Sequence, residues 1–234
     1  MLNWVQIPAR DGGQFDAHLV RPSGGAATGV VVCIQEIFGV NHAMRDIAQE
    51  WADKGYIAIA PDLFWRQEPH VDITDGTDEE WQKAFQLYQD FDADKGIEDL
   101  KATVDYARKL DGSNGKVGTV GFCLGGKMAY LMACRSDTDC NVGYYGVGIE
   151  EQLDEAAKIE APLILHIAEE DGFVPKEAQV KVKEALADNP NVTIHSYPGM
   201  DHAFARIGGK PYDKKNADLA NGRTDALFAK VLKG

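Results

Sequence analysis

The sequence has few of the features that mark a metal-binding, secreted or membrane protein. It contains four cysteines, and none of them belongs to a C-x-x-C pair, so the usual zinc and thioredoxin-type spacings are missing. No run of residues approaches the ~18 consecutive apolar residues of a membrane span. Residues 1–10 lack the basic patch and apolar run of a secretory signal. We therefore expect a cytoplasmic protein with free thiols, no metal and no membrane partner.

Basic side chains are scarce relative to acidic ones. Lys and Arg number 24 against 37 Asp and Glu, which gives a formal net charge of −13. This balance argues against nucleic acid as a partner, since sequence-independent binding needs clustered positive charge. A chain of 234 residues with 44% hydrophobic residues has the composition of a globular protein. We expect a monomer with a single domain over 1–234.

Short apolar strands alternate with amphipathic helices along the chain. Strands are predicted over 4–7, 15–20, 29–34, 56–60, 116–120, 142–147, 162–168 and 192–197, and helices over 42–54, 96–110, 124–134, 175–187 and 217–232. This alternation predicts an α/β fold with a mostly parallel central sheet and helices on both faces. The first two strands form a hairpin that adds an antiparallel N-terminal edge. The polar segment 68–80 is interpreted as a surface excursion or lid.

The segment Gly121-Phe122-Cys123-Leu124-Gly125-Gly126 lies between a predicted strand and a predicted helix. It has the form of a nucleophile elbow, G-x-S-x-G, with cysteine in place of serine. Its glycines remove side chains that would collide across the sharp turn, and the amides at the helix start favour a thiolate at Cys123. The alternative is a small buried cysteine in a glycine-rich turn. The remaining cysteines are expected to be packing or loop residues: Cys33, Cys134 and Cys140.

A cysteine nucleophile needs a base and an acid, which hydrolases of this architecture place later in the chain. His202 follows the last predicted strand in a short glycine-containing loop, and Asp171 follows the strand before it. Asp171 would fix the tautomer of His202 and stabilise its charged form. His202 could instead be an ordinary surface-loop histidine, and Glu169 or Glu170 could replace Asp171.

The segment Gln35-Glu36-Ile37-Phe38-Gly39 follows the strand 29–34. An α/β hydrolase places its second oxyanion-hole amide at this point, so the hole would be built from the backbone N–H groups of Ile37 and Leu124. Glu36 is a carboxylate in an apolar setting, where it could act on the site or simply pair with Arg45.

These motifs together, with Pro198-Gly199 and His202-Ala203-Phe204, resemble the dienelactone hydrolase (carboxymethylenebutenolidase) family. The resemblance covers the chain from Pro8 to nearly its end. It implies an α/β-hydrolase fold, a Cys123–His202–Asp171 triad and hydrolysis of a dienelactone to maleylacetate in the degradation of chlorinated aromatics, without a cofactor. It also implies that Glu36 meets the resting thiol of Cys123 and swings away when substrate binds.

The resemblance further implies a site for a carboxylate-bearing substrate. Arg206 matches one of two family arginines that hold the carboxylate, whereas the segment 81–88, where the second is expected, contains no arginine. Lys83 could take its place as a point charge, although lysine lacks the bidentate geometry of arginine, and Arg66 is the nearest arginine. Ala203 supplies no hydroxyl after the histidine. The other residues expected around the substrate are Phe38, Trp81, Phe85, Tyr88 and Phe173.

Two other functions fit the same residues. One is a promiscuous carboxylesterase or thioesterase of the same fold that needs no substrate carboxylate. The other is a non-catalytic binding or sensing module that uses Cys123 as a reactive thiol.

Overall fold

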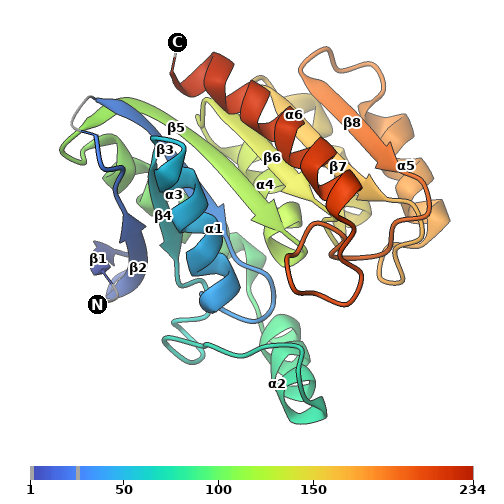
Figure 1. Ribbon diagram of the computed structural model, residues 1–234, viewed down its shortest axis with the longest axis horizontal. Helices are drawn as coiled ribbons and strands as arrows, with labels where there is room; N and C mark the ends of the chain where they lie inside the picture. Colours follow the sequence, from blue (N-terminus) through green and yellow to red (C-terminus); the bar gives the residue numbers. More distant parts are fainter. Residues whose placement is uncertain (1–2, 25–26, 234) are drawn as a thin grey trace. The chain divides into compact units, whose positions relative to one another are not determined.

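The computed structural model describes residues 3–24 and 27–233. Its chain is organised in two units, Met1–Val117 and Gly118–Gly234 (Figure 1). Strand β5 (Ser113–Phe122) contains the point where the first unit ends and the second begins. The prediction of one domain over 1–234 stays a prediction.

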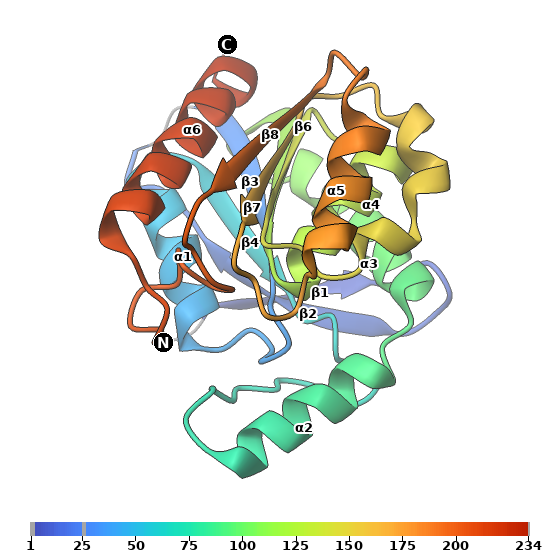
Figure 2. The same ribbon diagram turned by 90° about the vertical axis from the view of Figure 1, so that its right-hand side faces the viewer.

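The first unit contains β1 (Trp4–Pro8), β2 (Gln14–Val20), β3 (Thr28–Ile34), α1 (His42–Asp53), β4 (Ile57–Pro61), α2 (Asp78–Gln89) and α3 (Ala93–Arg108). β1 pairs with β2, and β2 with β4, in antiparallel fashion, while β3 and β4 are parallel. The predicted N-terminal hairpin is therefore confirmed. Every residue of β3 and β4 is buried, and α1 and α3 lie on opposite faces of these strands (Figures 1 and 2). Continuous apolar runs predict such doubly covered strands.

Helix α2 begins inside the segment that was interpreted as a polar excursion. Thr77 is its N-cap, and the side chain of Thr77 accepts from the N–H of Glu80 at 3.1 Å. The carboxylate of Glu80 accepts in turn from the Thr77 and Thr74 hydroxyls. This arrangement resembles a capping box, whose T-x-x-E pattern was present in the sequence but was not used to predict the helix.

The second unit contains α4 (Leu124–Arg135), β6 (Cys140–Tyr144), the 3₁₀ turns η1 (Ile149–Glu151) and η2 (Leu153–Lys158), β7 (Leu163–Ala168), α5 (Lys176–Leu186), β8 (Val192–Tyr197) and α6 (Lys214–Leu232). Strands β5, β6, β7 and β8 pair in that order and are all parallel. Figure 2 shows α6 on one face of these strands and α4 and α5 on the other. Because the strands are parallel, the loops after their carboxyl ends gather at one edge.

The ends of several elements differ from the sequence prediction, and two of these differences have a clear local reason. β6 ends at Tyr144 because Tyr145 has a positive φ of 37°, which a continuing strand does not accommodate. α6 begins at Lys214, earlier than predicted, because Asp213 caps it by accepting from the N–H of Asn216 at 2.8 Å. Within the ranges that the structure describes, no helix is long and apolar enough to cross a membrane.

Candidate active site

A tight turn between β5 and α4 carries Cys123. Its backbone has a φ of 56° and a ψ of −115°, a conformation that residues other than glycine rarely adopt. A β-carbon added at Gly121 would lie 1.9 Å from the carbonyl oxygen of Gly125, so the turn requires glycine at this position. The strained, glycine-flanked turn is the one that the G-x-C-x-G-G motif predicts for a nucleophile.

The start of α4 places a backbone donor beside Cys123. The N–H of Cys123 donates to the carbonyl of Tyr144 at 3.1 Å, and the carbonyl of Cys123 accepts from Gly126 and Lys127 at 2.9 and 3.3 Å. Leu124 is the first helical residue, so its N–H has no carbonyl one turn earlier to bond. The positive end of the helix dipole also lies here and favours a negative charge. The location of Leu124 therefore suits the predicted oxyanion donor.

The loops after β7 and β8 bring a carboxylate and an imidazole together. Nδ1 of His202 lies 2.8 Å from Oδ2 of Asp171, while Oδ1 of Asp171 accepts from the N–H of Phe173 at 2.8 Å. The side chain of Asp171 is 1% exposed and that of His202 is 11% exposed. Glu170, by contrast, pairs with Lys176 at the surface at 2.7 Å. Of these two carboxylates, Asp171 is thus the one beside the imidazole.

The electrostatic surroundings of His202 favour its protonated form. Burial alone disfavours the imidazolium, but the negative charge of a Cys123 thiolate and the hydrogen bonds with Asp171 and Cys123 outweigh it, so the pKa of His202 rises to about 10. An opposite charge within a few ångströms has this effect on a titrating group. Both Cys123 and Asp171 therefore act on the charge of the His202 ring.

Aromatic rings fix the orientation of the His202 ring. Tyr145 meets it edge-on at a centroid distance of 5.0 Å, and Phe173 does so at 4.9 Å. Tyr145 packs in turn against Phe204 at 5.8 Å. Tyr145 was not predicted as a site residue. The rule that ligands bind after the carboxyl ends of strands did not select it, because the strand was predicted to continue to residue 147 whereas β6 ends at Tyr144.

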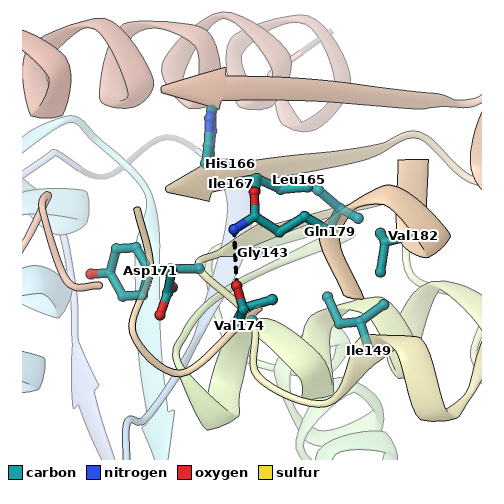
Figure 3. A pocket seen from close by; sticks show the side chains of 11 residues that line it. Gly143, Ile149, Leu165, His166, Ile167, Asp171, Val174, Gln179 and Val182 are labelled. Carbon is teal, nitrogen blue, oxygen red and sulfur yellow. Dashed lines mark hydrogen bonds between the residues drawn. The ribbon is translucent and has the colours of Figure 1, made fainter. Parts of the chain in front are cut away.

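A small cavity of about 20 Å³ lies behind Asp171 and is lined mainly by apolar atoms. This volume suits about one water molecule, so the cavity is not a substrate pocket. Figure 3 shows Gln179 of α5 crossing it to the carbonyl of Val174, a contact of 2.9 Å. Gln179 also donates to the carbonyl of Glu169 at 3.2 Å. Helix α5 thereby holds both ends of the loop that carries Asp171.

Three residues predicted around the substrate lie in the second unit, in the same loops. Phe173 is 47% exposed, and Ala203 is 2% exposed with a φ of 63°. Arg206 is half-buried in the turn after His202, where its N–H donates to the carbonyl of Ala203 at 2.9 Å. Its Nε lies 3.0 Å from where a β-carbon of Gly209 would stand. The guanidinium therefore lies along its own loop.

The other predicted residues lie in the first unit. Glu36, Ile37 and Phe38 are at most 6% exposed. Phe38 meets Trp81 edge-on at 5.2 Å, and Trp81 stacks on Phe85, which is 40% exposed, at 5.3 Å. Trp81 and Phe85 belong to helix α2, which also contains Tyr88. The roles predicted for these residues toward the thiol, the oxyanion and the substrate stay predictions.

Three cations of the first unit, which could pair with Glu36 or with a substrate carboxylate, contact other carboxylates in the structure. Arg45 pairs with Asp72 at 2.8 Å, and Lys83 pairs with Glu68 at 2.6 Å. The contacts of Arg66 are with Asp99 and Asp11. Lys83 and Arg66 are thus each engaged by an acidic side chain of their own unit.

The three remaining cysteines are buried and free. Burial raises the pKa of Cys134 to about 11 and raises the pKa of Cys33 and Cys140 as well, so all three stay neutral thiols near pH 7. This agrees with their interpretation as packing residues. Across residues 3–24 and 27–233, no group of three His, Cys, Asp or Glu side chains could hold a metal ion.

Comparison with known proteins identifies the family. Residues 15–232 match the model of the dienelactone hydrolase family. A protein of Azospirillum brasilense assigned as a carboxymethylenebutenolidase is 49% identical over 229 residues, which cover 97% of this chain and 98% of the relative. The carboxymethylenebutenolidase of Pseudomonas putida is 40% identical over 219 residues, covering 94% and 92% of the two chains. The chain belongs to the dienelactone hydrolase family.

A solved structure supports the same conclusion for the fold. The crystal structure of a Klebsiella pneumoniae protein assigned as a dienelactone hydrolase is 27% identical, with a TM-score of 0.86 and a coverage of 98% of both chains. The predicted α/β-hydrolase fold is confirmed, as is the predicted class of enzyme, a carboxymethylenebutenolidase-like hydrolase. The dienelactone hydrolase motifs in the sequence therefore identified the family correctly.

Proposed function

We propose that this chain opens the ring of an enol-lactone, a dienelactone that yields maleylacetate, with Cys123 as the nucleophile. In this proposal His202 is the base and Asp171 orients it. The observation that carries the proposal is the 2.8 Å contact of His202 Nδ1 with Oδ2 of Asp171, with Cys123 near enough to help raise the pKa of the imidazole. A charged imidazolium beside the sulfur stabilises the thiolate, which is the reactive form of cysteine.

In the first step the Cys123 thiolate attacks the lactone carbonyl carbon. The negative charge moves to the carbonyl oxygen, where the N–H of Leu124 at the start of α4 stabilises it. One such donor contributes about 2.7–4 kcal/mol in the transition state. The ring C–O bond then breaks, the leaving enolate takes the Nε2 proton of the His202 imidazolium, which leaves a neutral imidazole, and the acyl group stays on the sulfur as a thioester.

In the second step water releases the acid. His202 takes a proton from a water molecule, whose oxygen attacks the thioester carbonyl carbon, and the C–S bond breaks to restore the thiolate. Asp171 keeps Nδ1 of His202 protonated, so that Nε2 is the atom that exchanges protons. An enolate is a better leaving group than a simple alkoxide, which suits a cysteine nucleophile.

The proposal is tested with Cys123→Ala and with Cys134→Ala as the matched control. Cys134 lies at the far end of the same helix, and its pKa is raised, so its removal should leave turnover within about twofold. Cys123→Ala should abolish hydrolysis of a dienelactone and of 4-nitrophenyl acetate, with an unchanged circular dichroism spectrum. Residual turnover above one tenth of the wild-type value in Cys123→Ala contradicts the assignment.

A second candidate is a carboxylesterase for neutral esters. It is favoured by the engagement of Lys83 and Arg66 with carboxylates, because neither side chain then supplies the second cation expected for a substrate carboxylate. Under the main proposal, Arg206→Ala should raise KM for the dienelactone at least tenfold more than KM for 4-nitrophenyl acetate. Equal effects on both substrates favour the neutral esterase instead.

A further inference from the structure

The loop that carries His202 contains a residue in the left-handed backbone conformation. Ala203, directly after His202, has a φ of 63°, in the left-handed region that disfavours residues with a β-carbon. A strained conformation persists where the surrounding contacts determine it. The contacts that hold this loop therefore bear on where the His202 ring lies.

Two hydrogen bonds tie this loop to the loop that carries Asp171. The N–H of Glu170 donates to the carbonyl of Met200 at 2.8 Å. The N–H of Gly172 donates to Oδ1 of the Asp201 side chain at 3.1 Å. The same Oδ1 accepts from the N–H of His202 at 2.7 Å.

Asp201 thus joins the residue after the acid to the base itself through one oxygen atom. The carboxylate as a whole is at the surface, so it does not contribute by filling a core position. A local turn would explain the bond to His202, its neighbour in the sequence, but the bond to Gly172 crosses 29 residues.

We propose that Asp201 is a positioning residue, which sets the separation of Asp171 and His202 by accepting the N–H groups of Gly172 and His202 on Oδ1. The inference rests on the proposed function, since it assigns Asp201 to the same Asp171–His202 pair. What the position requires is an acceptor at one point in space. A negative charge alone does not meet this requirement.

Two substitutions separate these requirements. Asp201→Asn keeps an acceptor oxygen at the same distance from the backbone and removes the charge. Asp201→Glu keeps the charge and moves the oxygens by one methylene. Asp201→Ala removes both, and Asp218→Ala is the matched control, because Asp218 is an exposed aspartate of α6 that pairs with Lys214.

Turnover of 4-nitrophenyl acetate gives the first readout. Misplacement of a catalytic group by a fraction of an ångström lowers turnover, so Asp201→Ala and Asp201→Glu should reduce kcat about tenfold while KM stays within twofold. Asp201→Asn and Asp218→Ala should retain kcat within twofold. The proposal is overturned if Asp201→Asn is as impaired as Asp201→Ala, or if Asp201→Glu is fully active.

The second readout does not need ester hydrolysis. The rate of Cys123 alkylation by iodoacetamide is measured from pH 5 to 9, and the Nδ1 proton of His202 is observed by NMR. In Asp201→Ala the alkylation rate at pH 6 should fall about fivefold, because a displaced imidazolium stabilises the thiolate less. The NMR signal of the His202 Nδ1 proton should broaden or vanish. If the wild type hydrolyses no ester, the proposed function fails and this readout still decides the role of Asp201. An unchanged alkylation profile and proton signal in Asp201→Ala, with or without a lower Tm, shows a structural role alone.

Discussion

Two histidines of the second unit have opposite electrostatic surroundings. His202 contacts a carboxylate and a thiol, and its pKa is raised to about 10. His166 of β7 contacts two hydroxyl groups, Tyr197 at 2.8 Å on Nδ1 and Thr224 at 3.1 Å on Nε2. Burial, with the positive charges of His195 and Arg223, lowers the pKa of His166 well below 6.5.

The difference shows that burial does not decide the charge of a histidine in this protein. Burial disfavours the imidazolium in both places, and the partners determine the outcome. Anionic partners make His202 a group that exchanges protons, whereas neutral partners make His166 part of a fixed network with Tyr144, Thr224 and Tyr197. The first arrangement suits catalysis and the second suits stability.

The largest expected effect comes from removing the anionic partner of His202. Asp171→Asn should lower kcat about 10³–10⁴-fold, since the amide no longer stabilises the imidazolium and allows the wrong tautomer. The pKa of His202, followed by NMR of the ring carbons, should fall below its wild-type value. Glu170→Gln, beside it in the same loop, should change kcat less than twofold. Equal turnover in the two variants would remove Asp171 from the proposed triad.

The sequence predicted the family and the α/β fold because both depend on local patterns. Buried strands such as 29–34 appear as apolar runs. The catalytic side chains of such folds directly follow the carboxyl ends of strands. This rule selected Cys123, Asp171 and His202, and the last two lie 2.8 Å apart in the structure.

What the sequence did not predict depends on contacts between loops. The bond of Asp201 to Gly172 joins two loops, and no pattern within either loop predicts it. Tyr145 contacts the His202 ring because β6 ends with a positive φ, which tyrosine gives no reason to expect. Helix α2 was missed because its first turn lies in the charged segment 68–80, which was interpreted as a surface excursion, although Ala84 and Leu87 follow as buried residues of the helix.

The next effect is on stability and concerns the partners of His166. Thr224→Val removes the hydroxyl that lies 2.7 Å from the Tyr144 hydroxyl and 3.1 Å from His166. Because buried polar groups are left without this partner, we expect a loss of about 1–3 kcal/mol in the free energy of unfolding. Urea unfolding measures the loss, and kcat should stay within twofold. Thr193→Val, at an exposed position of β8, is the control and should change stability by less than about 0.5 kcal/mol. An equal loss of unfolding free energy in Thr224→Val and Thr193→Val would mean that the hydrogen-bond network of His166 contributes little to stability.

The smallest effect concerns how stability changes with pH. The pKa of His166 is lowered in the folded protein, so below pH ~6.5 the unfolded chain binds a proton at this residue and the folded chain does not. The stability that neutral His166 contributes is therefore present at pH 7 and is lost as the pH falls toward its folded pKa. The loss from this one group is at most about 1.4 kcal/mol per pH unit. His166→Gln should remove it and flatten the curve of unfolding free energy between pH 7 and 5, whatever its effect at pH 7. His195→Gln removes a group whose pKa is also lowered but which is less buried, so it should flatten the curve less. If the two variants and the wild type have parallel curves, His166 is not held neutral by its surroundings and the contrast with His202 fails.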